Sequence, residues 1–195
     1  MGIKRTPFLN FLVLCNPSVL SRPQDLLCID YTIFLKSCDL ASLAMSGFQP
    51  VHYVPASRQA QMLAMPVKRI LAVPHRKAGG TNHWCLYLST SPTSSIRIDC
   101  QPSHAVPSSA QFILDVTTGL SVRQVVGEIT RYGRYKYEFD ANGVGCRCWT
   151  TDQINLLYQL QFLSNASQVT AAKAGILKLW PDQTPLPLDQ GAYYQ

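Results

Sequence analysis

A cysteine that follows a glycine-rich loop has the surroundings best suited to chemistry in this chain. Cys146 comes directly after Gly143 and Gly145, and an amphipathic segment that predicts a helix follows it. A helix that begins beside a cysteine places partial positive charge and free N–H groups near the sulfur, which stabilises a thiolate and any oxyanion formed next to it. Cys146 is therefore predicted to be a nucleophile, and a buried, inert thiol is the structural alternative.

His83 is the candidate base for this thiol. It lies in the segment Asn82–Leu88, where His83, Cys85 and Tyr87 alternate with apolar residues in the pattern of a strand. An imidazole on a strand is held rigidly, and it can take the thiol proton if the two segments meet in space. In the structural alternative, His83 only bonds a backbone carbonyl at the end of its strand.

The group that orients His83 is expected on the next strand. The segment Ile96–Cys100 follows a turn-rich stretch, so the two strands predict an antiparallel hairpin. Asp99 shares a face with His83 in one of the two registers open to this pair. Asp99 is the first candidate for fixing the tautomer of His83. The next candidates, in order, are Gln101 and His104. The alternative partners of Asp99, as an ion pair, are Arg97 and Arg147.

The predicted helix after Cys146 carries a second start signal. Thr150 and Gln153 have the spacing of a capping box, in which a threonine side chain caps the helix and a glutamine three residues later bonds back to it. If Thr150 is the N-cap, Cys146 lies in the preceding loop, where the helix dipole acts on it more weakly.

A metal site is the competing use of these residues. Two cysteines and two histidines provide enough ligands for a tetrahedral zinc ion, namely Cys146, Cys148, His83 and His104. The Cys-x-Cys spacing is shorter than the usual one and the histidines lie far apart, so we expect no metal here. The glycine pairs of the chain match neither a P-loop nor a dinucleotide fingerprint, and we expect no cofactor.

The elements that must position these residues predict an α+β fold, with an antiparallel sheet of about four to five strands packed against two or three helices. The predicted strands cover residues 67–73, 82–88, 96–100, 111–117 and 135–139. One helix begins after Ser121, because Val122, Val125 and Ile129 repeat at helical spacing. The others follow Thr150 and cover residues 167–179.

Three parts of the chain are distinguished by composition. Residues 1–47 predict an N-terminal extension of uncertain order, residues 48–180 a single α+β domain, and residues 181–195 an irregular C-terminal tail. The extension places Lys4 and Arg5 before an apolar run, which resembles a secretion signal without its cleavage site. We expect a cytoplasmic protein, with secretion as the alternative.

Charge and cysteine content exclude several classes of protein. The formal net charge of +6 is spread along the chain without a basic run or a nucleic-acid-binding motif, so no nucleic acid is expected as a partner. The seven cysteines lack the regular spacing of a secreted disulfide scaffold. No apolar stretch approaches the ~18 residues of a transmembrane helix. The expected partner is a small-molecule substrate or ligand, and the oligomeric state is open.

Three sequence blocks carry a resemblance to known families: Asn82-His83-Trp84-x-x-Tyr87-Leu88, Arg97-Ile98-Asp99 and Gly143-x-Gly145-Cys146-Arg147-x-Trp149. Together they resemble an uncharacterised family of fungal proteins, which implies no established activity. The order of a histidine strand, a polar strand and a cysteine before a helix is also similar to the circularly permuted papain-like thiol proteins, the NlpC/P60 and lecithin:retinol acyltransferase group.

The second resemblance implies a cysteine-dependent hydrolase or acyltransferase that acts on an amide or an ester. It implies that Cys146 is the nucleophile, His83 the base and Asp99 or Gln101 the orienting group. The chain departs from that group at Arg147 and Trp149, which replace the usual flanking residues.

Two non-catalytic hypotheses stand beside this one. In the first, aromatic side chains line an apolar ligand pocket in which Arg147 holds an anion. Its lining residues would be Trp84, Tyr87, Tyr135, Tyr137 and Trp149. In the second, the chain is a partner-binding protein that works through residues 1–47.

Overall fold

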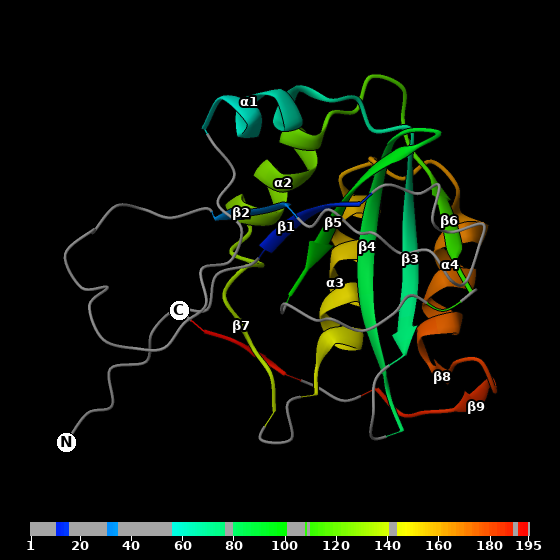
Figure 1. The fold of residues 1–195 in the computed structure, drawn as a ribbon. Helices are drawn as coiled ribbons and strands as arrows, with labels where there is room; N and C mark the ends of the chain where they lie inside the picture. The colour runs from blue at the N-terminus through cyan, green and yellow to red at the C-terminus, as the bar shows by residue number, and fades with distance from the viewer. Residues whose placement is uncertain are drawn as a thin grey trace, which may run out of the picture.

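The computed structural model describes residues 11–15, 31–34, 56–76, 80–100, 108, 110–140, 144–188 and 191–194. In this part of the chain, a six-stranded antiparallel sheet in the order β2-β1-β5-β4-β3-β6 forms the centre of an α+β fold (Figure 1). The strands are β1 (Phe11–Cys15), β2 (Tyr31–Phe34), β3 (Arg69–Arg76), β4 (Asn82–Ser91), β5 (Ser94–Asp99) and β6 (Phe112–Asp115). The α+β class predicted from the sequence is thereby confirmed.

Two of these strands come from residues predicted to be an extension. β1 lies beside β5 and pairs with it from Phe11 opposite Asp99 to Cys15 opposite Ser95, and β2 pairs with the other side of β1. Part of residues 1–47 therefore contributes directly to the sheet that carries the predicted site.

The hairpin of β4 and β5 forms in the register that the candidate site requires. Leu86 lies opposite Ile98 and Tyr87 opposite Arg97. Side chains opposite each other in an antiparallel pair share a face, so Asp99 comes to the face of His83.

The helices are α1 (Ala56–Ala64), α2 (Val122–Arg131), α3 (Cys146–Gln159) and α4 (Ala166–Ile176). Figure 1 shows α3 and α4 running behind the sheet, and α1 and α2 side by side near one end of it. The apolar residues of the strands face this helical layer and form the main core with it. Its fully buried members include Trp84, Leu86, Leu88, Ile96, Trp149, Ile154 and Leu157.

The three helices after the sheet begin in different ways. Ser121 caps α2 as predicted: its side chain accepts from the N–H of Gln124, and the Gln124 side chain accepts from the N–H of Ser121. Asn165 caps α4. The N-cap of α3 is Gly145, and no side-chain hydrogen bond caps it within the described residues.

The prediction that Thr150 caps α3 is wrong. Thr150 lies inside the helix, where its hydroxyl donates to the carbonyl oxygen of Trp84 on β4 at 3.4 Å. Gln153 donates to the Trp149 carbonyl oxygen at 3.1 Å and not to the backbone of Thr150. Thr150 thus bonds to the sheet and Gln153 bonds within the helix, so neither caps α3, which starts five residues earlier than an N-cap at Thr150 would place it.

The C-terminal part of the chain contains short strands where an irregular tail was expected. β8 (Lys178–Leu179) pairs with β9 (Thr184–Pro185), and β10 (Ala192–Tyr193) pairs with β7 (Tyr137–Glu138). In Figure 1 the last described segment, in red, runs back toward β7 and the beginning of α3. Among the helices of the described segments, none is long and apolar enough to cross a membrane.

Candidate active site

His83 and Asp99 form a buried pair on one face of the sheet. The Nε2 atom of His83 lies 2.8 Å from Oδ1 of Asp99, and the two residues are only 3% and 0% exposed. The second carboxylate oxygen of Asp99 accepts from the thiol of Cys85 at 3.2 Å and lies 3.1 Å from Nη2 of Arg97. Asp99 therefore contacts both His83 and Arg97, two of the partners expected for it from the sequence.

The surroundings of His83 favour its protonated form. Burial by itself lowers the pKa of His83, but hydrogen bonds with Asp99, Cys146 and Cys85 and the charge of Asp99 outweigh burial and raise the pKa well above its usual value of 6.5. The contact with the buried Asp99 carboxylate at 2.8 Å therefore favours a charged imidazole ring.

Cys146 is the first residue of α3 and is 5% exposed. Its Sγ atom donates to the carbonyl oxygen of Asn82 at 3.5 Å, which places the thiol against the first residue of β4, next to His83. The N–H groups of a first helical turn have no partner within the helix, and α3 lacks a capping side chain in the described residues. Positive potential from the helix and from His83 therefore meets at this sulfur.

The neighbouring cysteines have less reactive environments. Burial, reinforced by the charge of Asp99, raises the pKa of Cys85 to about 12 and also raises that of Cys100. Burial raises the pKa of the half-buried Cys148 as well. Because only a thiolate is a good nucleophile, these raised pKa values make the three thiols poor nucleophiles at neutral pH.

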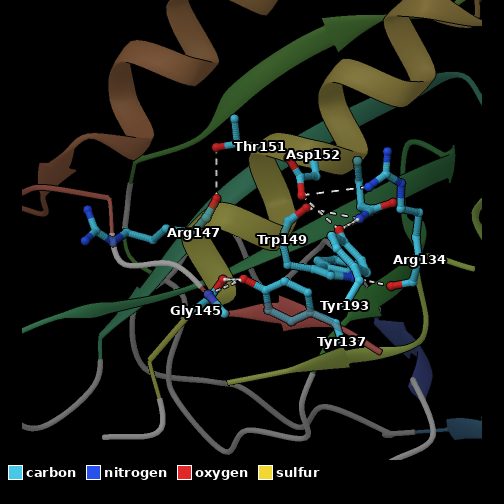
Figure 2. Close-up of polar contacts among 10 residues, drawn as sticks. Arg134, Tyr137, Gly145, Arg147, Trp149, Thr151, Asp152 and Tyr193 are labelled. Atoms are coloured by element: carbon cyan, nitrogen blue, oxygen red, sulfur yellow. Dashed lines mark hydrogen bonds and ion pairs between the residues drawn. The ribbon is translucent and has the colours of Figure 1, made fainter. Parts of the chain in front are cut away.

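The loop before α3 is held by a tyrosine on β7. Figure 2 shows the Tyr137 hydroxyl directed at Gly145, to whose carbonyl oxygen it donates at 3.0 Å, and the same hydroxyl accepts from the N–H of Gly191 at 2.9 Å. Gly145 has φ of 149°, and a Cβ atom there would lie 3.2 Å from Tyr137 and from Phe139. The close approach of these two rings therefore requires glycine before Cys146.

A second group of contacts ties the C-terminal strand β10 to the outer side of α3. The Tyr193 hydroxyl donates to Asp152 at 3.0 Å, and the guanidinium of Arg134 lies 5.0 Å above the Tyr193 ring (Figure 2). The indole N–H of Trp149 donates to the carbonyl oxygen of Arg134 at 2.8 Å. Residues that precede α3 in the chain and residues that follow it thus hold the first two turns of the helix.

Arg147 is buried and contacts the C-terminal segment. Its guanidinium donates to the carbonyl oxygens of Ile176 at 3.3 Å, Leu186 at 2.9 Å and Pro187. In Figure 2 it extends away from the Tyr137 and Tyr193 network. These contacts make Arg147 a clamp on the backbone after α4, a role that differs from the anion binding considered for it.

The aromatic residues of the ligand-pocket hypothesis do not gather in one place. Trp84 and Trp149 are fully buried in the core between sheet and helices, whereas Tyr87 belongs to a small cluster that includes Val73 and Cys85. Tyr137 holds the loop before α3. Tyr135 is half-buried.

The structure adds His75 to the site. His75 lies opposite His83 in the pairing of β3 with β4, with the two rings 6.2 Å apart, and its Nε2 atom is 2.9 Å from the Tyr87 hydroxyl. The sequence interpretation ended this strand at Val73 because Pro74 follows. β6 pairs with Arg69–Ala72 of β3, so Pro74 lies beyond the end of β6. Proline has no backbone N–H, and at this position β3 loses no hydrogen bond to β6 because of it.

The donor atoms that cluster differ from the zinc set considered in the sequence. One ligand atom each of His83, Cys85 and Asp99 lies within 4.8 Å of the others. Cys148 lies instead beside Tyr137, which contributes a hydrogen bond to its environment. His104, the remaining member of that zinc set, falls outside the described residues, as does Gln101, the second candidate for orienting His83.

Comparison with known proteins places the chain in a family without giving it an activity. No curated protein and no solved structure matched the chain. One family model matched residues 69–194, which span β3 to β10 and include Cys146, His83 and Asp99. The chain therefore belongs to the family described as a domain of unknown function, DUF7770.

Proposed function

We propose that this protein is a cysteine-dependent hydrolase or acyltransferase that acts on an amide or ester of a small substrate. In this proposal Cys146 is the nucleophile, His83 the general acid and base, and Asp99 the group that orients the imidazole. One observation carries the proposal: His83 is hydrogen-bonded to Asp99 at 2.8 Å, and the sulfur of Cys146, at the first turn of α3, lies 3.5 Å from the carbonyl oxygen of Asn82, the residue before His83.

The chemistry needs a proton to move between two neighbouring groups. Nε2 of His83 faces Asp99, which leaves Nδ1 as the ring nitrogen that exchanges a proton with Cys146. The thiolate attacks the acyl carbonyl carbon, and the protonated imidazole then gives its proton to the leaving alcohol or amine. The resulting thioester is released by water in a hydrolase or by a second alcohol or amine in an acyltransferase, with His83 accepting the proton of the attacking group.

The first turn of α3 supports the same reaction. The attack of sulfur on a carbonyl group places negative charge on oxygen, and backbone N–H groups at a helix start stabilise such an oxyanion. Within the described residues, α2 and α4 use Ser121 and Asn165 to occupy the corresponding N–H groups, whereas α3 has no capping side chain.

A competition between two cysteines of α3 tests the proposal without a known substrate. Cys148 is more exposed than Cys146, so access alone makes it the faster of the two to react with iodoacetamide. We expect the reverse at neutral pH, with peptide mapping by mass spectrometry showing Cys146 modified first. His83→Gln should slow modification of Cys146 by roughly 100-fold, which is the lower end of a general base's contribution, and leave the rate at Cys148 unchanged.

The covalent intermediate provides the second measurement. An activated ester such as a 4-nitrophenyl ester should acylate the wild-type protein once per chain before slower turnover, and the added mass should map to Cys146. Cys146→Ser should show neither the burst nor the adduct. Equal, slow modification of all cysteines by iodoacetamide, together with no acyl adduct, would contradict the assignment.

A further inference from the structure

Three donor atoms of different types meet on the face of the sheet that carries His83. His83 and Cys85 are two residues apart on β4, so their side chains point to the same face, and Asp99 reaches that face from β5. One ligand atom from each of the three lies within 4.8 Å of the other two, and all three residues are buried.

The separations between these atoms are close to those of a metal site. Zinc bonds of 2.0–2.3 Å in tetrahedral geometry place neighbouring ligand atoms roughly 3.3–3.8 Å apart. Oδ1 of Asp99 lies 2.8 Å from Nε2 of His83, and Oδ2 of Asp99 lies 3.2 Å from Sγ of Cys85, so a small movement of the side chains makes room for an ion. Oδ2 can remain with Arg97 at 3.1 Å while Oδ1 binds the metal.

We propose that Nε2 of His83, Sγ of Cys85 and a carboxylate oxygen of Asp99 bind a divalent cation of the zinc type. The donor set of one nitrogen, one sulfur and one oxygen suits Zn²⁺ or Co²⁺, and it does not suit Mg²⁺ or Ca²⁺, which take oxygen ligands. With three protein ligands, the fourth position is open to water or to an added ligand.

A cobalt titration tests the metal site without reference to activity. Co²⁺ added under anaerobic conditions to chelator-treated, reduced protein should produce a thiolate-to-cobalt charge-transfer band that saturates at one ion per chain. Cys85→Ser keeps a hydroxyl beside Asp99 and should abolish the band, with affinity at least about tenfold weaker. Cys148→Ser, the matched control on α3, should leave both unchanged. X-ray absorption of the wild-type zinc complex should show one sulfur among nitrogen and oxygen ligands, which needs no variant.

The absence of a saturable band, or a band that survives in Cys85→Ser, would overturn the metal site. A Cys146 that reacts no faster than Cys148 refutes the proposed function, and the cobalt result stands independently of it.

Discussion

The proton held by His83 makes the stability of the folded protein depend on pH in a calculable way. The folded-state pKa of His83 lies well above 6.5, the value expected in the unfolded chain. Above about pH 6.5 the folded protein keeps a proton that the unfolded chain releases. The stability from this group is therefore fully present below that pH and is lost as the pH rises toward the folded-state pKa.

The perturbation is His83→Gln, made in a Cys146→Ser background. The serine ensures that the proton on the imidazole comes from solvent and not from the neighbouring thiol, and glutamine retains an N–H that can reach Asp99. One bound proton changes the unfolding free energy by about 1.4 kcal/mol per pH unit. Between about pH 6.5 and about pH 8, where the unfolded imidazole passes from half to almost no protonation, the loss sums to about 1.6 kcal/mol.

The assay is urea unfolding followed by tryptophan fluorescence, since Trp84 and Trp149 are both fully buried. The free energy of unfolding of Cys146→Ser should fall across this pH range, relative to that of the double variant, by the amount calculated. Parallel curves for the two proteins would mean that His83 is not charged in the fold, and the reasoning about its partners would be refuted. If the Cys146 thiol supplies the proton on His83, the unfolding free energy of the wild type should change less with pH, relative to that of His83→Gln, than in the serine background.

Two further predictions concern the packing around the site. Gly175→Ala should destabilise the protein by roughly 1–3 kcal/mol because the added methyl group overlaps the ring of Phe112. Gly127→Ala should stabilise the protein by about 0.5–1 kcal/mol, because Gly127 has open space around it in α2. A loss of stability at both positions in urea unfolding would contradict the packing argument. Arg147→Met should cost roughly 1–3 kcal/mol because it leaves the buried contact with the Ile176 carbonyl oxygen and the part-buried contact with the Leu186 carbonyl oxygen without their donor, and limited proteolysis should then cleave residues 184–188 faster than in the wild type.

The elements that local periodicity determines could be predicted from the sequence. β4 and β5 alternate between polar and apolar side chains, and α2 repeats its apolar residues at helical spacing after a serine cap. Elements that depend on distant contacts could not. The start of α3 is set by Tyr137, by Phe139 and by the burial of Thr150 against β4, none of which a local capping pattern contains.

The candidate site divides along the same line. The alternation along β4 and the hairpin that follows identify His83 and Asp99 as neighbours, and the order of elements suggests Cys146 as their partner. The register that joins His83 to Asp99 needs the pairing itself, because a shift of one residue reverses the faces. His75 was missed because a proline precedes it in the sequence, although β3 continues through Pro74 to Arg76.

The clamp formed by Arg147 joins the candidate nucleophile to a stretch of backbone far along the chain. Cys146 and Arg147 are adjacent, so whatever loosens residues 184–188 also loosens the turn that holds the sulfur. We expect that gentle heating changes the rate at which iodoacetamide modifies Cys146 at a temperature where the circular dichroism of the protein is still native. Storage buffers, purification tags and fusion partners at the C-terminal end should accordingly be judged by thiol reactivity, since a melting curve would miss the damage.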